Sequence, residues 1–220
     1  MRLLTQPPVL KSAAIAAIFT ALACFPRLAL WDQRSRPLWY LELALLLCSS
    51  ILWAFVFAWY PEHTRRPAFR PPRRAGLWAL ATCSGVAVAA LLHWLVDPQA
   101  RAATPQDYPT DFGGWLASTA FTLSFNLLFL TLAPVALLLR LLQRRAAAVT
   151  FTVLLGVFMM YLKMTSSPES PAPELLVRLL AARILIGALA ASLFLEGGVW
   201  LAWWWALLLQ GRHLLTLAGG

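Results

Sequence analysis

Six polar side chains lie within or beside the long apolar stretches of this chain, where they could bind ions, relay protons or pair with one another. They are Arg27, Glu42, Asn126, Arg140, Arg183 and Glu196. If these stretches cross a membrane, each charged group there is costly and is a candidate functional residue. Glu42 could relay protons. A structural ion pair with Arg27 is the alternative, because both residues are expected near the same membrane face.

Arg183 is expected deepest in the membrane, since it follows Glu174 by about 13 Å along a helix. Its side chain should face the bundle interior, with Asn126 or Glu42 as a partner. Two interpretations stay open from these residues. Arg183 is either a structural residue or part of a polar path that Glu42, Asn126 and Arg183 form together.

Two further sets of polar residues stand close together in the sequence. Glu196 directly precedes Gly197-Gly198 and could cap that turn, but no second acid or histidine that general acid–base catalysis would need is adjacent. His93 and Asp97 are spaced to share one helix face and predict a local pair, whereas a metal site would need a third ligand. The three cysteines lack C-x-x-C spacing. With no H-E-x-x-H, G-x-S-x-G or P-loop motif, we predict no catalytic, cofactor or metal site.

The composition predicts the elements that must position these residues. Of 220 residues, 60% are apolar and 12% charged, whereas a soluble domain has about 25% charged residues. This pattern excludes a soluble enzyme and indicates an all-α, polytopic transmembrane helix bundle of six or seven spans, forming one integral membrane domain over residues 1–220. A span needs about 20 apolar residues. The predicted spans are 12–31, 37–60, 75–96, 115–139, 146–162, 174–195 and 199–217.

The net charge of +9 is interpreted as an orientation signal rather than as nucleic-acid binding. Arginines gather in the segment 61–76 and after residue 139, whereas acidic residues gather in 97–111. Cytoplasmic loops carry the excess of Lys and Arg, so the N-terminus should be cytoplasmic. The abundance of Ala, Leu, Arg and Trp indicates a bacterial chain. We therefore expect a multi-pass protein of the bacterial inner membrane, with the lipid bilayer and other membrane proteins as partners.

Proline and glycine should interrupt two of the spans. Pro134 removes a backbone hydrogen bond and should kink the fourth span. Gly197-Gly198 should break the helix and turn the chain. Beyond this turn two arrangements stay open. Either a seventh span carries Arg212 and His213 to the outer side, or the last apolar stretch is short or re-entrant.

The second half of the chain, over residues 115–210, resembles the CAAX-protease and bacteriocin-processing (CPBP) family of intramembrane proteases. The segment 133–140, APVALLLR, resembles the family's first motif, and the segment 186–202 resembles its penultimate helix, glycine turn and last helix. Arg140 matches the motif. Val135 and Ala136 stand where the family has paired glutamates, and Leu162 stands where it has a histidine. The resemblance therefore implies a relative without the catalytic residues.

Three functions follow as hypotheses. The leading one is a non-enzymatic inner-membrane protein that acts as an assembly, scaffold or accessory partner, including the case of a degenerate CPBP-like relative. The second is a small transporter or channel subunit with a polar path through Glu42, Asn126 and Arg183. The third, ranked last, is an active intramembrane protease, which would need two acids or histidines within reach of each other.

Overall fold

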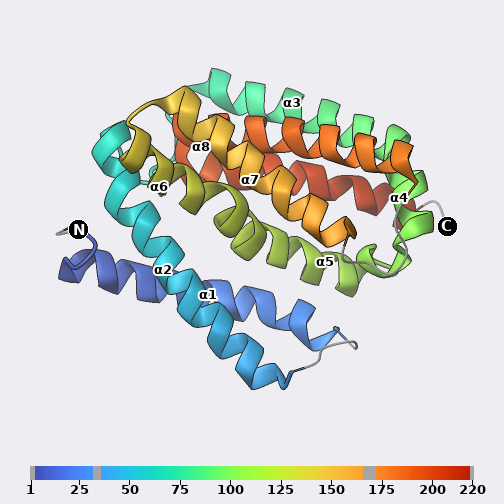
Figure 1. The fold of residues 1–220 in the computed structure, drawn as a ribbon, viewed down its shortest axis with the longest axis horizontal. Coiled ribbons are helices and arrows are strands. Elements are labelled where there is room, and N and C mark those ends of the chain that lie inside the picture. The colour runs from blue at the N-terminus through green and yellow to red at the C-terminus, as the bar shows by residue number, and fades with distance from the viewer. Residues whose placement is uncertain (1–2, 32–35, 166–171, 219–220) are drawn as a thin grey trace.

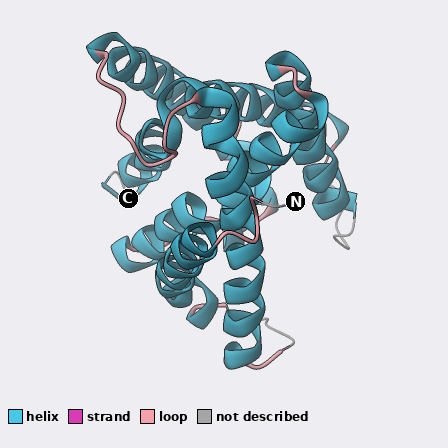
Figure 2. Cartoon of the chain, turned by 90° about the vertical axis from the view of Figure 1, so that its left-hand side faces the viewer, coloured by secondary structure: helices cyan, strands magenta, loops and turns pink. Residues whose placement is uncertain are grey.

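The computed structural model describes residues 3–31, 36–165 and 172–218, and every regular element in them is a helix (Figures 1 and 2). The elements are α1 (Pro7–Ala29), α2 (Leu38–Thr64), α3 (Ala75–Leu95), α4 (Asp97–Ala103), a 3₁₀ turn (Pro105–Asp107), α5 (Phe112–Phe121), two π-helical turns (Thr122–Asn126 and Leu128–Leu132), α6 (Ala133–Leu142), α7 (Arg145–Thr165) and α8 (Pro173–Ala218). Six helical stretches are long and apolar enough to cross a membrane. This confirms the predicted multi-pass helical membrane fold.

Helix α8 consists of two arms that run in opposite directions (Figure 1). Gly198, with φ 75° and ψ −165°, has non-helical backbone angles and separates an arm at 173–197 from an arm at 199–218. Glu196 contacts Arg145, whereas Arg212, near the end of the second arm, contacts Asp97. The second arm therefore returns to the end of the bundle where Asp97 lies. Within the described residues the second arm is thus a seventh pass along the bundle, and whether it forms a seventh membrane span stays a prediction.

The reversal requires glycine at position 198. Its backbone angles belong to a region that only glycine adopts without strain. A Cβ there would lie 2.5 Å from the Ala68 carbonyl oxygen. The same oxygen accepts a hydrogen bond from the Val199 N–H at 2.9 Å. The predicted break at Gly197-Gly198 is thus confirmed, and it lies where the α2–α3 loop meets the turn between the arms.

The fourth span is one continuous stretch, Phe112–Leu142, that leaves α geometry in its middle. The Leu127 N–H donates to the Thr122 oxygen, and the Ala133 N–H donates to the Leu128 oxygen. These bonds span five residues and define π turns. Pro134, which lacks an N–H, follows directly. The irregularity predicted from Pro134 therefore occupies the two turns before the proline, and α geometry resumes at Ala133.

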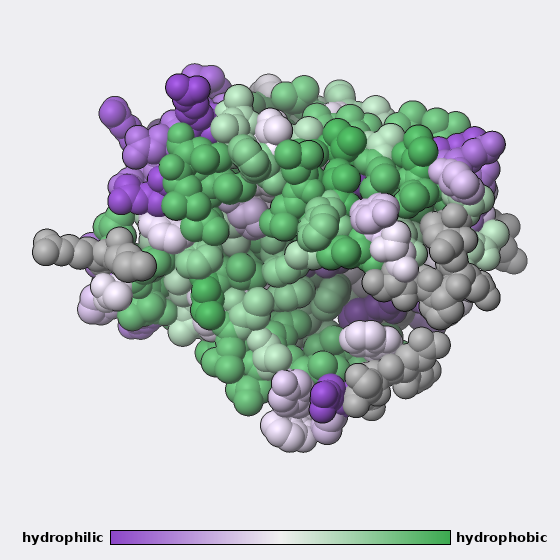
Figure 3. Space-filling model, in the orientation of Figure 1, coloured by the Kyte–Doolittle hydropathy of each residue, from purple (hydrophilic) through white to green (hydrophobic). Residues whose placement is uncertain are grey.

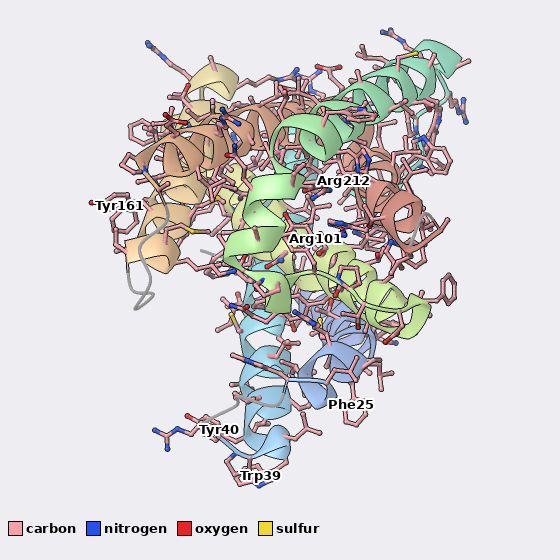
Figure 4. All side chains as sticks on the ribbon, turned by 90° about the vertical axis from the view of Figure 1, so that its right-hand side faces the viewer. Phe25, Trp39, Tyr40, Arg101, Tyr161 and Arg212 are labelled. Carbon is pink, nitrogen blue, oxygen red and sulfur yellow. The ribbon has the colours of Figure 1, made fainter. Side chains whose placement is uncertain are left out.

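Charged side chains gather at two opposite ends of the molecule, with an apolar belt between them (Figure 3). We call these the arginine end (Arg65, Arg66, Arg70, Arg73, Arg74, Arg140, Arg144 and Arg145) and the aspartate end (Asp97, Asp107 and Asp111). Exposed aromatic residues at the aspartate end include Trp31, Trp39, Tyr40, Trp94 and Tyr161. Figure 4 shows Trp39, Tyr40 and Tyr161 pointing away from the bundle. Such an aromatic rim marks a membrane–water interface.

Candidate functional site

A cavity of about 830 Å³ extends from the aspartate end to the middle of the bundle. Helix α1, the α4–α5 connection, the fourth span, α7 and both arms of α8 contribute to its walls. Figure 3 shows hydrophilic atoms recessed below the apolar surface on the right-hand side of the molecule. The charged and polar lining residues include Arg27, Lys163, Arg183, Arg212, Asp107, Ser118, Thr122 and Asn126, and the apolar ones include Phe121, Leu130, Met159, Met160, Met164 and Leu179.

Arg183 lies deepest among the cations of the cavity, against the backbone of α7. A Cβ at Gly156 would lie 2.7 Å from its Nε and 2.8 Å from its Nη2. The glycine therefore makes room for the guanidinium. Arg183 forms no hydrogen bond or ion pair with any described residue, and it lines the cavity. Because the guanidinium of Arg183 has no hydrogen-bond acceptor among the described residues, an anion or water must solvate it in the cavity.

The two π turns place polar groups of the fourth span in the cavity. Thr122 and Asn126, at the ends of the first π turn, both line it, as does Leu130 from the second. One turn earlier, Ser118 also lines the cavity, and its buried hydroxyl has no hydrogen-bond partner in the described chain. A π turn adds a residue per turn and so changes which side chains face a given neighbour. This stretch supplies uncharged hydrogen-bonding groups opposite Arg183.

Arg212, in the second arm of α8, also lines the cavity, and its guanidinium contacts an acid and a backbone oxygen. Its Nε donates to Asp97 Oδ2 at 2.9 Å, and its Nη1 donates to the Leu209 oxygen at 2.7 Å. The ion pair is buried, since the two side chains are 14% and 6% exposed. The Tyr108 hydroxyl donates to Asp97 Oδ1 at 3.1 Å. Asp97 therefore uses both oxygens, and Arg212 is held as a structural residue.

Arg101 extends this network toward the last turn of the second arm. Its guanidinium lies 5.2 Å from the centre of the Tyr108 ring and donates to Thr216 Oγ1 at 2.8 Å. Figure 4 shows Arg101 from α4 and Arg212 from α8 side by side between these helices. Burial raises the pKa of Tyr108, and the nearby Asp97 carboxylate raises it further. The phenol thus remains a hydrogen-bond donor well above neutral pH.

Two predicted pairs of residues are not formed in the described chain. Asp97 pairs with Tyr108 and Arg212 rather than with His93, whose Nδ1 is buried without a hydrogen-bond partner. Arg27 lines the cavity without contacting Glu42 through a hydrogen bond or ion pair. Glu42 does not line the cavity, and its Oε1 is buried without a partner. The predicted Arg27–Glu42 and His93–Asp97 pairs were therefore wrong.

Three of the six candidate residues share the cavity, and the other three lie elsewhere. The cavity brings together Arg27, Asn126 and Arg183. Glu42 lies apart, and the remaining two belong to the arginine end, where Arg140 contacts Glu62 at 3.2 Å and Glu196 contacts Arg145 at 3.6 Å. Of the three residues of the predicted polar path, Asn126 and Arg183 line the cavity and Glu42 does not, so the path through all three stays a prediction.

Sequence reasoning missed four residues of the site: Tyr108, Gly156, Lys163 and Arg212. Lys163 pairs with Asp107 at 2.7 Å at the cavity mouth, where both side chains are exposed. The sequence does contain a signal for Lys163, because a single lysine at the end of an apolar stretch is unusual. Arg212 follows an apolar stretch in the same way. The sequence contains no such signal for Gly156, because glycine in a membrane helix most often serves close packing between helices.

The positions that carry the protease resemblance do not meet in one place. Val135 and Ala136 are fully buried in α6 near the arginine end, whereas Leu162 is exposed on α7 beside Lys163, at the aspartate end. Among the described residues no three His, Cys, Asp or Glu side chains gather as metal ligands would. No known protein family, curated protein or solved structure matches this chain. The resemblance to the CPBP family stays a prediction.

Proposed function

We propose that this chain is a non-enzymatic, multi-pass membrane protein that binds an anionic amphiphile, a molecule with a carboxylate or phosphate group and an apolar chain, in its interhelical cavity. The observation that carries the proposal is the Arg183 guanidinium, which faces the cavity with no acidic partner in the described chain. Arginine binds carboxylates and phosphates through a planar fork of N–H donors.

The charges that line the cavity favour an anion. Four cationic side chains line it, and two of them are already neutralised, Lys163 by Asp107 and Arg212 by Asp97. Arg27 and Arg183 remain without an acid among the described residues. Glu42 lies outside the cavity, so the lining offers no free carboxylate that would attract a cation or carry a proton. Low-dielectric walls strengthen the attraction between these cations and an anionic ligand.

The apolar lining favours a ligand with a hydrocarbon part. Three methionines of α7, Met159, Met160 and Met164, share the wall with Phe121 and Leu179. Methionine side chains are flexible and adapt to irregular apolar ligands. The volume of about 830 Å³ lies within the range of about 300–1,000 Å³ that is typical of small-molecule sites.

The same proposal includes an accessory role at the bacterial inner membrane, with the N-terminus in the cytoplasm. The excess of arginines at one end of the bundle supports this orientation, since Arg101, Lys163 and Arg212 at the other end are balanced by three aspartates. It would open the cavity toward the outer side, where an anionic lipid or lipid precursor could enter. We further propose that any relation to the intramembrane proteases is that of a non-catalytic relative.

Transport of the same anion is a second candidate, which the π turns of the fourth span favour. Irregular helices line the binding sites of many transporters because their backbone can rearrange there. Thr122 and Asn126 bound such a turn in the cavity wall. Transport adds a requirement that binding does not have, namely counterflow of the ligand across sealed vesicles. Binding without counterflow would leave the accessory role and exclude the second candidate.

The test uses purified full-length protein in neutral detergent and compares palmitate, dodecyl phosphate and the uncharged alcohol 1-hexadecanol as probes. Quenching of tryptophan fluorescence reports binding. We expect the anionic probes to bind at least tenfold more tightly than the alcohol, and Arg183→Gln to remove that preference. Arg183→Lys should keep part of it, because lysine retains the charge but not the fork.

Two variants act as controls for this test. Arg178→Gln removes an exposed arginine of the same arm that does not line the cavity, so the preference should be unchanged. Gly156→Ala places a methyl group where the Arg183 guanidinium lies and should weaken binding of the anions severalfold. Equal binding of palmitate and hexadecanol, or an Arg183→Gln protein that is folded and binds palmitate normally, would refute the proposal.

A further inference from the structure

A second hollow lies at the opposite end of the bundle, formed by the loop between α2 and α3. Its volume is about 440 Å³, and its lining includes Arg66, Arg70, Arg73 and Arg74 together with Glu196 and Leu77. Four guanidinium groups thus face one small volume, separated from the interhelical cavity by the length of the helices. The proposed function does not use this hollow.

The loop that carries these arginines is fixed to the bundle by its backbone. Three of its carbonyl oxygens accept hydrogen bonds from the body of the protein: Ala68 from the Val199 N–H at 2.9 Å, Phe69 from Trp200 Nε1 at 2.9 Å and Pro72 from Trp78 Nε1 at 3.1 Å. Arg66 Nη2 also donates to the Glu196 carbonyl oxygen at 2.6 Å. The backbone that carries the arginines therefore has a fixed conformation, and less conformational entropy is lost when the loop binds a ligand.

The acids at this end are already paired with arginines from other helices. Glu62 contacts Arg140 of α6, and Glu196 contacts Arg145 of α7. Within the described chain, Arg70, Arg73 and Arg74 form no hydrogen bond or ion pair through their side chains. Four arginines and one glutamate line the hollow, and that glutamate contacts Arg145, so positive charge exceeds negative charge there. An anion with several acceptor oxygens would relieve the repulsion between these side chains.

The surroundings of the hollow place this charge at a membrane surface. The membrane-spanning helix α3 begins at Ala75, directly after the arginines, and Leu77 joins its lining. Trp200 and Trp204, partly exposed, lie on the neighbouring arm of α8, where Trp204 Nε1 donates to Thr82 of α3. Tryptophan side chains of this kind occupy the headgroup region of a bilayer. The phosphates of lipid headgroups lie in this same region of a bilayer.

We propose that the hollow binds the phosphate of an anionic phospholipid headgroup from the surrounding membrane. Arg70, Arg73 and Arg74 supply the N–H donors, and the apolar start of α3 contacts the acyl chains. Such a site differs from the general attraction between basic loops and acidic lipids, because it depends on where the arginines are and not only on how many there are.

The experiment measures how much lipid full-length protein retains in neutral detergent, by native mass spectrometry, with dioleoyl phosphatidylglycerol and dioleoyl phosphatidylcholine as probes. We expect preferential retention of phosphatidylglycerol. Made in the Arg183→Gln protein, whose interhelical cavity has lost its free guanidinium, the double variant R73Q/R74Q should weaken that retention at least tenfold. The control R65Q/R144Q removes the same charge from exposed arginines of the same end that do not line the hollow, and it should change retention less than twofold.

The same measurements distinguish a defined lipid site from diffuse charge attraction and from a site for a soluble phosphate. An equal loss in both double variants would show diffuse attraction and overturn the proposal. Displacement of phosphatidylglycerol by equimolar glycerol 1-phosphate would show a site for a soluble phosphate and overturn the assignment to a lipid. Phosphatidylglycerol that is retained after Arg183→Gln but lost with R73Q/R74Q is assigned to the hollow, which distinguishes it from lipid in the interhelical cavity. Size-exclusion profiles and thermal unfolding of every variant confirm that each protein compared is folded.

Discussion

The two arms of α8 carry arginines in opposite situations. Arg212, in the second arm, is held in a buried ion pair with Asp97, which a hydrogen bond from Tyr108 completes. Arg183, in the first arm, lies against Gly156 and faces the cavity without an acidic partner in the described chain. The same residue type on the same helix is therefore neutralised in one arm and lines a cavity in the other. A charge at membrane depth indicates function only when the protein itself has not neutralised it.

The largest expected effect breaks the partnered side of this comparison. Asp97→Asn should lower the free energy of unfolding by about 3 kcal/mol, because it leaves Arg212 buried without a counter-charge. Unfolding of the detergent-solubilised protein, followed by tryptophan fluorescence, measures the loss. Asp107→Asn is the matched control. It breaks an exposed pair with Lys163 and should cost less than about 1 kcal/mol. Similar losses in both variants would show that the Asp97–Arg212 pair has no special structural role.

A smaller effect is expected where the two arms meet. Gly198→Ala should lower the free energy of unfolding by about 2 kcal/mol, since alanine at this φ is strained and its Cβ would crowd the Ala68 oxygen. Gly211→Ala, also in the second arm, introduces a methyl group into open space and should be neutral or slightly stabilising. The same unfolding assay compares them. A Gly198→Ala protein as stable as the unchanged chain would mean that the turn between the arms can relax.

The smallest expected effect concerns the pH dependence of the partnered arm. Because the pKa of Tyr108 is raised in the folded protein above its usual value near 10, its contribution to stability is fully present below pH 10. It is lost as the pH rises from 10 toward the folded pKa, because the unfolded chain then releases the proton first. Tyr108→Phe should therefore flatten the fall in stability above pH 10. An unchanged slope in the variant would assign that fall to other groups.

Hydropathy patterns predicted the membrane helices and the break in α8, because the residues that decide each of these features lie next to one another in the sequence. Apolar stretches of sufficient length predicted the membrane helices, and Gly197-Gly198 predicted the break in α8. Pro134 predicted an irregular fourth span but not where the irregularity begins. Pro134 lacks the N–H that would donate to a carbonyl oxygen about four residues earlier. The backbone that the proline disturbs is therefore the stretch before it, and the π turns lie there.

The candidate site was predicted only in part, because contacts between helices depend on rotation and depth. Arg27, Asn126 and Arg183 were identified as polar residues in apolar surroundings, and they do share a cavity. Glu42 was identified by the same rule but faces elsewhere. The rule detects an unusual side chain and does not indicate the direction in which its helix turns it.

The sequence by itself determined the class of this protein, the first six membrane-length helical stretches and the excess of arginines at one end. These follow from the free energy of placing each residue type in hydrocarbon or in water, which is a local property. Only the tertiary structure decided which arginine is neutralised. Asp97 and Arg212 are separated by 115 residues, and their pairing arises from the packing of α4 against the returning arm. Arg183 has no acid within reach among the described residues for the same reason, and its guanidinium lines the cavity.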